Sequence, residues 1–239
     1  MRATTSGFGL ALGSGLVVLV GCGLIKSDIA TLTFQMPSKT FSFDTASSMW
    51  KAPPATFPAV PCGAGQMVTD CCHPPAPAPV PDCVATPLAC ENGVCVVEFP
   101  VSVTQKIDLK AEVPSLMNVG SQSLADVTIT QIQYTIASTM NVDLPPIQIF
   151  IAPESVTSAS DPSAKKFGTV PATPAMATRS GDVVLDPAGQ AAFTQYAHQL
   201  GTPFNLISTT TMIVTPGSPI PTGRVDATVT GKVSAKLSL

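Results

Sequence analysis

Six cysteines lie close together between Cys62 and Cys95, and they are the residues whose type and spacing could support chemistry. An even number of closely spaced thiols predicts either disulfide bonds or a thiolate metal site. A zinc site could add His73 to the thiolates, but the chain has no Cys-x-x-Cys pair, the spacing typical of such sites. We therefore expect three disulfides and no metal site among these cysteines, which are Cys62, Cys71, Cys72, Cys83, Cys90 and Cys95.

The order of the six cysteines leaves their pairing open, because six thiols allow about 15 combinations. Cys71 and Cys72 are adjacent, and a bond between neighbours strains disulfide geometry, so each is expected to bond elsewhere. Asn92-Gly93 lies between Cys90 and Cys95, and this dipeptide is typical of a tight turn. We expect the turn to carry the chain out of the cysteine cluster into the next strand.

The N-terminus has the layout of a secretory signal peptide, because a basic residue, Arg2, precedes an apolar run at residues 8–20. The run is about 13 residues long, shorter than the roughly 20 needed to cross a bilayer. It ends on Leu19-Val20-Gly21-Cys22, which resembles the lipobox of bacterial lipoproteins. That resemblance implies removal of residues 1–21 as a signal peptide and acylation of the Cys22 thiol.

The lipoprotein resemblance implies a cell-envelope location, with the membrane bound through an N-terminal lipid anchor. Two or more acyl chains, palmitate among them, give stable attachment. Gly23 rather than aspartate follows Cys22, which points to the outer membrane in bacteria that sort lipoproteins by this position. The protein would then face the periplasm or the cell surface. Two alternatives stay open: ordinary secretion with Cys22 incidental, and retention of the apolar run as an anchor. An oxidising compartment favours disulfides over zinc.

The composition favours strands and ordered loops. Only 11% of the residues are charged and the formal net charge is −3, so the basic footprint required for nucleic-acid binding is missing. Threonine, serine, alanine, valine and proline dominate, a mixture that suits strands. We predict a mainly β fold, an antiparallel β-sandwich of about seven strands with one helix and a disulfide-rich, proline-rich insert. The expected division is a lipidated N-terminus with the first strands at 22–48, the Pro/Cys-rich disulfide module at 49–96 and the β-sandwich domain at 97–239.

The last strand has the cleanest pattern. Every odd position in residues 225–239 is Val, Ala, Gly or Leu, and every even position is Asp, Thr, Lys or Ser, which predicts a half-buried antiparallel strand. We expect a kink at Gly231. The pattern predicts that Val229, Val233 and Leu237 face the core while Thr228, Lys232 and Lys236 face solvent.

Other strands alternate less regularly. Residues 97–109 keep one apolar parity across Pro100, which predicts a bend there. Residues 127–136 change parity, which predicts a bulge near Thr130-Gln131. Two short alternating runs within residues 30–43 predict the first strand and its partner or continuation.

Prolines and caps mark the remaining elements. The run at 142–151 is broken by Pro145-Pro146, which predicts an edge or bent strand. No period is visible between Pro153 and Ser180, where we expect a mobile surface loop. A helix is predicted near 187–200, with Asp186 as its cap. Its apolar stripe should cover a sheet face or plug one end of the sandwich, and consists of Phe193, Tyr196, Ala197 and Leu200.

The strand count and the helix-then-strand order resemble the LEA14-type sandwich of late-embryogenesis-abundant proteins. The residues that carry this likeness are 204–214 and Pro219-Ile220-Pro221. It is a likeness of architecture and implies a sandwich fold alone.

Outside the cysteines, no residues are spaced for catalysis. The chain has no Gly-x-Ser-x-Gly, His-Glu-x-x-His or phosphate-binding glycine motif. His198 has no orienting partner in its neighbourhood, Asp182 and Asp186 flank a short apolar run, and Asp143 should face solvent. We expect the protein not to be an enzyme and to bind no cofactor. Two aromatic residues could form a binding surface, but we favour an anchor that holds the proline-rich loop to the core; these are Trp50 and Phe57.

Two functions fit these observations. The first is a non-enzymatic envelope lipoprotein with a structural, adaptor or surface-interaction role, which binds envelope proteins through sheet edges and the cysteine module. The alternative is a carrier or sensor of an apolar ligand within the sandwich. A carrier should enclose a dry cavity of a few hundred cubic ångströms. An adaptor should have a filled core and an exposed apolar patch.

Overall fold

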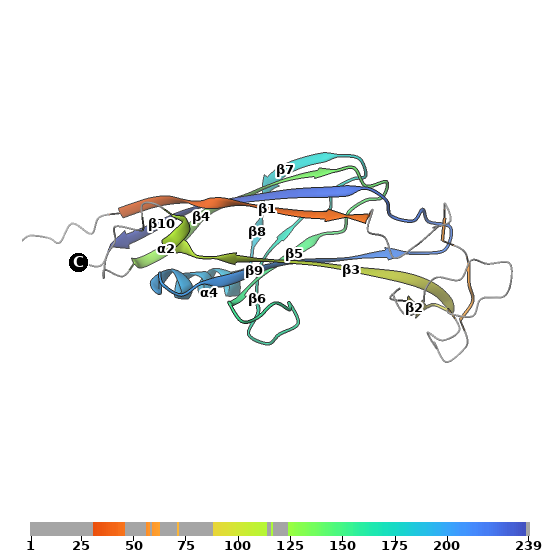
Figure 1. Ribbon diagram of the computed structural model, residues 1–239, viewed down its shortest axis with the longest axis horizontal. Coiled ribbons are helices and arrows are strands. Elements are labelled where there is room, and N and C mark those ends of the chain that lie inside the picture. Colours follow the sequence, from red (N-terminus) through yellow and green to blue (C-terminus); the bar gives the residue numbers. More distant parts are fainter. Residues whose placement is uncertain are drawn as a thin grey trace, which may run out of the picture.

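The chain folds into two antiparallel sheets packed face to face, which confirms the predicted β-sandwich. The computed structural model describes residues 31–45, 56–57, 59–62, 71, 88–113, 116 and 124–237. Figure 1 shows the two sheets as an upper and a lower layer, with helices α2 (Leu109–Glu112) and α4 (Pro187–His198) at the same end. The four-stranded sheet has the order β1 (Thr31–Asp44), β10 (Arg224–Leu237), β4 (Leu124–Ser138) and β7 (Thr178–Asp182). The six-stranded sheet has the order β2 (Leu88–Glu91), β3 (Val94–Ile107), β9 (Phe204–Val214), β5 (Ile147–Pro153), β6 (Lys165–Val170) and β8 (Val184–Leu185).

Strand β10 lies between β1 and β4 and follows the predicted alternation. Val233 is fully buried and Lys232 is exposed, as predicted. Thr228 and Lys236 keep part of their surface in solvent. Val229 has the inward parity but is only half-buried. The sheet therefore has one core face and one solvent face, and the core face is not filled evenly.

β10 continues as a strand through Gly231, and its ladder with β4 shifts register one residue later, between Lys232 and Val233. A Cβ at Gly231 would lie 2.7 Å from the Met36 side chain, so the glycine makes room for methionine. The two apolar runs near the N-terminus form one strand, β1, with a bulge between Met36 and Lys39. The side chain of Leu237, predicted to be in the core, lies outside the described residues.

The bulge predicted in β4 is present. Lys232 pairs with Gln131 and the next residue, Val233, pairs with Ile129, so Thr130 has no partner in the ladder. The extra residue shifts the parity of the strand. The apolar residues on both sides of the bulge therefore still reach the core.

The segment from Pro153 to Ser180 is not the loop that we predicted, because it contains β6 and the start of β7. β6 shows no period of two because a bulge interrupts it: Ile149 pairs with Gly168 and Phe150 with Lys166, so Phe167 is an extra residue. Phe167 and Gly168 are adjacent and both buried. Helix α4 lies directly against the backbone of β6, where a Cβ on Gly189 would lie 2.2 Å from the Phe167 Cα.

β5 is a central strand, so the expectation of an edge strand was wrong. It pairs with β9 on one side and with β6 on the other. Pro145-Pro146 precede the strand and take no part in its ladder. The two prolines end the segment before β5 and leave its hydrogen bonds intact.

β3 remains one strand through Pro100. Its pairing with β2 ends at Val97, so beyond this point one edge of β3 has no strand partner among the described residues. An unpaired edge tolerates a proline. β3 ends at Ile107, and Leu109, predicted to belong to the strand, begins α2 instead.

Helix α4 forms where predicted. Asp186 caps it, because its Oδ1 accepts a hydrogen bond of 2.9 Å from the Ala188 N–H. Phe193 of the helix lies 6.2 Å from the ring of Phe167 in β6 and 6.0 Å from that of Phe204 in β9, measured between ring centroids. The helix plugs one end of the sandwich, the second of the two placements expected for it (Figure 1).

Candidate functional site

Two disulfides lie at the end of the sandwich opposite α4 (Figure 1). Cys62 is bonded to Cys90, and Cys71 to Cys95. Cys90 and Cys95 face each other across the β2–β3 hairpin. The predicted turn is confirmed at Asn92-Gly93, whose φ angles of 52° and 78° lie in the left-handed region. The hairpin therefore holds one cysteine of each disulfide.

We call this end the disulfide tip: residues 56–57 and 59–62, Cys71 and the β2–β3 hairpin. Its small core joins Phe57 and Val60 to Ile220, which lies between β9 and β10. Phe57 is buried, so the predicted anchoring role is confirmed for this residue. Other residues singled out in this region lie outside the described residues, namely Trp50, Cys72, His73 and Cys83.

The described cysteines of the disulfide tip stabilise the fold through disulfide bonds. The Sγ atoms of Cys62, Cys71 and Cys95 lie within 4.8 Å of one another, a spacing that a metal ion could bridge. Each sulfur is bonded in a disulfide, however, and metal binding requires the thiolate. The tip is thus a cross-linked cap on the six-stranded sheet.

The titratable side chains noted in the sequence lie on separate elements. His198 is exposed in the last turn of α4. Asp182 accepts a hydrogen bond of 2.9 Å from Gln131 Nε2. Asp143 is exposed, as predicted, and accepts a hydrogen bond of 2.8 Å from the Ala175 N–H. Each carboxylate therefore forms a hydrogen bond between two neighbouring segments: Asp182 of β7 with β4, and Asp143 with the segment before β7.

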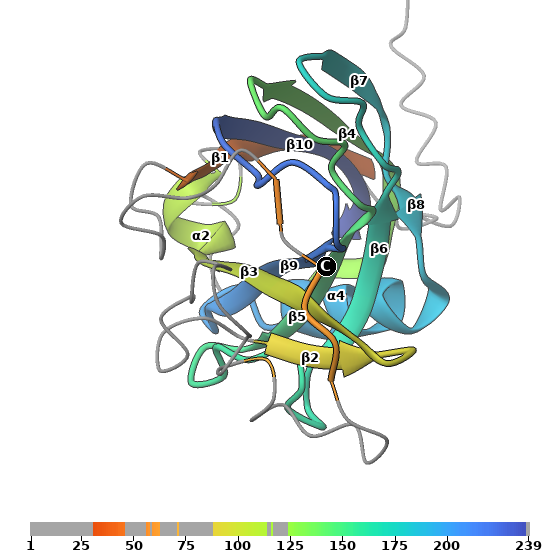
Figure 2. The same ribbon diagram turned by 90° about the vertical axis from the view of Figure 1, so that its right-hand side faces the viewer.

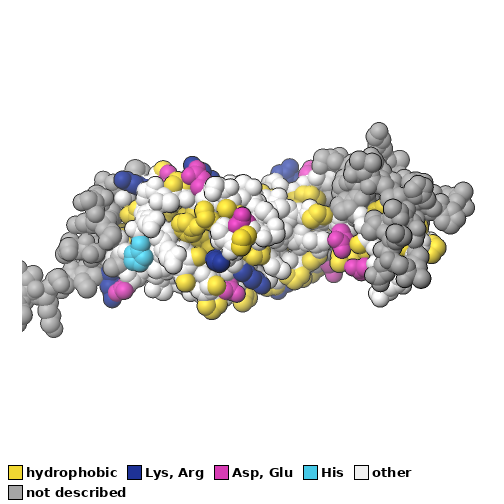
Figure 3. All heavy atoms as spheres, turned by 90° about the horizontal axis from the view of Figure 1, so that it is seen from below, with side chains coloured by type: hydrophobic (Ala, Val, Ile, Leu, Met, Phe, Trp, Pro, Cys, Tyr) yellow, Lys and Arg dark blue, Asp and Glu magenta, His cyan; other side chains and the backbone are white. Residues whose placement is uncertain are grey.

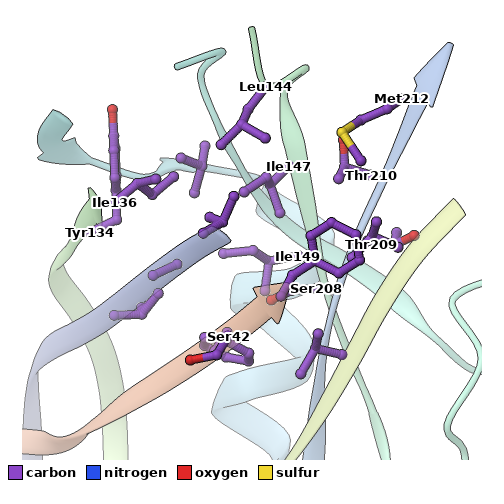
Figure 4. A pocket seen from close by; sticks show the side chains of 18 residues that line it. Ser42, Tyr134, Ile136, Leu144, Ile147, Ile149, Ser208, Thr209, Thr210 and Met212 are labelled. Atoms are coloured by element: carbon purple, nitrogen blue, oxygen red, sulfur yellow. The ribbon is translucent and has the colours of Figure 1, made fainter. Parts of the chain in front are cut away.

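An apolar cavity lies between the sheets, in the half of the sandwich away from α4 (Figure 4). β1, β4 and β10 form one wall, and β3, β5, β6 and β9 form the other. The space open to the centres of water-sized molecules is about 70 Å³. At 10–15 Å³ for each such sphere, this is room for roughly five molecules. Residues that line it include Phe41, Ile136, Ile149, Val170, Met212 and Val225.

The cavity exists because the inward residues in this half are small. Ala227 and Val229 lie on the inner face of β10, between β1 and β4, yet both remain half-buried, so their free surface faces the cavity. Ser208 and Thr210 of β9 line the opposite wall. Near α4 the space left between the sheets is smaller, about 20 Å³, and the rings of Phe193 and Phe204 line it. The half of the core near α4 is therefore packed more tightly than the other half.

The cavity reaches the surface between β1 and β3, which are edge strands at this level. Phe43 of β1 and Val101 and Val103 of β3 line the cavity while remaining partly exposed. Figure 2 shows α2 between the same two strands. An ion pair of 2.5 Å between Lys39 Nζ of β1 and Glu112 Oε2 of α2 joins the helix to the strand. The mouth of the cavity is therefore the part of the β1–β3 gap that α2 leaves uncovered.

The described surface has few exposed apolar side chains. Figure 3 shows one face, on which apolar residues are interspersed with polar and charged ones. Three large apolar side chains of the described residues are well exposed, and they lie on different segments: Met176 before β7, Val184 in β8 and Ile213 in β9. None of the helices in the described part of the chain has the length and apolar character required to span a bilayer.

Comparison with known proteins assigns no family. No protein-family model and no curated protein matches the chain. Among solved structures, turnip yellow mosaic virus is 13% identical over 60% of this chain and 82% of that chain, with a TM-score of 0.23. The empty head of the same virus is 12% identical over 100% and 92%, with a TM-score of 0.21. Desmodium yellow mottle tymovirus is 11% identical over 60% and 89%, with a TM-score of 0.21. Similarities at this level carry no argument about ligand, partner or assembly.

Proposed function

We propose that this protein is a non-enzymatic lipoprotein of the bacterial cell envelope that binds an apolar ligand between the sheets of its sandwich. The observation that carries the proposal is the apolar cavity, with its mouth between β1 and β3. Binding sites for small apolar molecules are concave, apolar and largely formed before the ligand arrives. A cavity walled by both sheets meets these conditions.

The size of the cavity limits what can enter. At about 70 Å³, the cavity is smaller than the few hundred cubic ångströms of a site that encloses a whole ligand. A slender apolar segment fits, and the rest of the ligand would remain at the mouth.

A purely adaptor role has less support. An adaptor that binds through apolar contacts should have a filled core and a contiguous apolar patch on its surface. In the described residues the core is partly hollow, and the exposed apolar side chains are dispersed.

Binding of an uncharged apolar dye tests the proposal. N-phenyl-1-naphthylamine fluoresces when it leaves water, and its phenyl ring can enter the cavity while its naphthyl group stays at the mouth. The Cys22→Ser protein that is released from the membrane, without residues 1–21, can be studied without detergent, which would itself take up the dye. Ala227→Leu places three more carbon atoms in the cavity and should weaken dye binding about tenfold or more, a change of about 1.4 kcal/mol. Ala137→Leu makes the same change on the exposed face of β4 and should bind like the parent. Equal binding by the two variants would place the dye elsewhere and contradict the proposal.

The lipid anchor is tested separately. Cys22 is the one cysteine that follows a lipobox-like run. Cys22→Ser should therefore release the protein from the membrane fraction or leave the precursor uncut, as seen by fractionation and mass spectrometry. Ser27→Ala, a nearby change outside the run, is the control. A Cys22→Ser protein that matures normally and stays with the membranes would argue against lipidation.

A further inference from the structure

The inner face of β9 changes character along the strand. Phe204 and Leu206, near α4, are apolar and buried. The next inward positions carry hydroxyls, Ser208 and Thr210, before Met212 restores the apolar pattern. The two hydroxyls coincide with the hollow half of the sandwich.

The strand register shows that Ser208 faces the cavity. It pairs with Val103 of β3 and with Ile149 of β5, and both partners line the cavity. Residues paired directly in antiparallel strands point to the same face of the sheet. Figure 4 shows Ser208 beside Ile149 on the cavity wall. Ser208 is also only one strand away from the mouth, because β9 is the neighbour of β3.

The two hydroxyls differ in their hydrogen bonding. Thr210 Oγ1 donates a hydrogen bond of 3.2 Å to the carbonyl oxygen of Pro146. The Ser208 hydroxyl makes no hydrogen bond to another of the described residues. A polar group in an apolar space is costly unless something in that space bonds to it. The Ser208 hydroxyl is therefore the group in this wall that is available to a ligand.

The cavity is also uncharged. No Asp, Glu, Lys, Arg or His is among the described residues that line it. Burying an ionised group without a partner costs far more than burying a neutral one. An anionic or cationic head group would thus be rejected, whereas a neutral oxygen could bond to Ser208.

We propose that the cavity binds a single-chain, uncharged amphiphile, such as a fatty alcohol or a monoacyl ester. Its oxygen shares a hydrogen bond with the Ser208 hydroxyl near the mouth, and its hydrocarbon chain lies against Ile149 and Val170 farther inside. This assignment rests on the proposed function, because it requires that the cavity take an apolar ligand.

Displacement of the dye by three six-carbon compounds tests the assignment in the Cys22→Ser chain. These probes, 1-hexanol, hexane and hexanoate at pH 8, share a short unbranched chain and differ in the head group. Ser208→Ala should weaken binding of 1-hexanol about three- to tenfold, the range that one neutral hydrogen bond supplies. It should leave hexane binding equal or slightly stronger. Hexanoate should bind less tightly than 1-hexanol. Thr211→Ala removes an exposed hydroxyl from the opposite face of β9 and should change nothing.

The possible results separate the two proposals. If the parent protein binds neither dye nor hexane, the proposed function fails. If dye and hexane bind but Ser208→Ala changes hexane and 1-hexanol by the same factor, the apolar site stands and the role of Ser208 is refuted. Tighter binding of hexanoate than of 1-hexanol would overturn the uncharged class of ligand. A loss confined to 1-hexanol supports the assignment.

Discussion

Replacing Ala227 with leucine is expected to make the protein more stable, because the new side chain enters space that the described residues leave empty. Each buried methylene contributes about 0.8 kcal/mol, so three added carbons contribute about 2.4 kcal/mol at most. Ordering the leucine side chain costs about 0.5–1 kcal/mol. An imperfect fit of the leucine side chain reduces the remaining gain in stability further. We expect the free energy of unfolding to rise by about 1 kcal/mol, within the range seen when cavities are filled.

Equilibrium unfolding in denaturant, with the disulfides intact and bound lipid removed, measures this change. Lipid must be removed because a ligand that binds only the folded protein would stabilise the parent more than the variant. Ala137→Leu, on the exposed face, should stay within about 0.5 kcal/mol of the parent. A loss of about 1–3 kcal/mol in Ala227→Leu is the usual cost of overpacking. It would mean that this face is already filled, and the reasoning that leads to a ligand site would be refuted.

Two further predictions concern the faces of β10. Val233→Ala should lower the free energy of unfolding by about 1–3 kcal/mol, because Val233 is fully buried, whereas Lys232→Ala on the exposed face should cost at most about 0.5 kcal/mol. Equal losses in denaturant unfolding would mean that both faces are covered. On the outer face, hydrogen bonds from Arg224 and then Ser42 lower the pKa of the Asp226 carboxyl from 3.8 to about 2. Since this pKa is lower in the folded chain than in the unfolded one, the carboxylate supports the fold above about pH 4, and that support is lost as the pH falls towards 2. An NMR titration should find the low midpoint, and Ser42→Ala should raise it; a midpoint near 4 in the parent would argue against these hydrogen bonds.

Elements whose signals are local could be predicted from the sequence. The cap of α4 at Asp186, the turn at Asn92-Gly93 and the bulge at Thr130 are all present. Each depends on the backbone and hydrogen-bonding preferences of a few neighbouring residues. The alternation along β10 is local in the same sense, because one strand with one covered face imposes a period of two.

Elements whose environment comes from distant residues could not be predicted in this way. β6 lacks alternation because it has a bulge at Phe167, where it pairs with β5 and where Gly189 of α4, about 20 positions later, packs against its backbone. β5 is central because β6 and β9 pair with its two edges. Pro145-Pro146 gave no information about those edges, since both prolines precede the strand.

The candidate site is of this second kind. Ala227 lies on β10, and Ser208 and Thr210 lie on β9, and these residues share one space only after the two sheets pack. Each is small or polar at an inward position of an otherwise apolar alternation. That local departure is the signal that could have located the cavity, but its meaning depends on which residues face it across the sandwich.

The placement of the disulfides has a mechanical consequence. Cys62–Cys90 and Cys71–Cys95 both fasten segments to the β2–β3 hairpin, and neither joins one sheet to the other. β1 is hydrogen-bonded to β10 and β3 to β9, each within its own sheet. In the described part of the chain, side-chain contacts and the Lys39–Glu112 ion pair span the gap between β1 and β3. Widening that gap breaks neither of these disulfides and neither of these strand ladders. The two sheets can therefore separate along the β1–β3 edge while each keeps its own hydrogen bonds, and such a separation would enlarge the cavity beyond about 70 Å³.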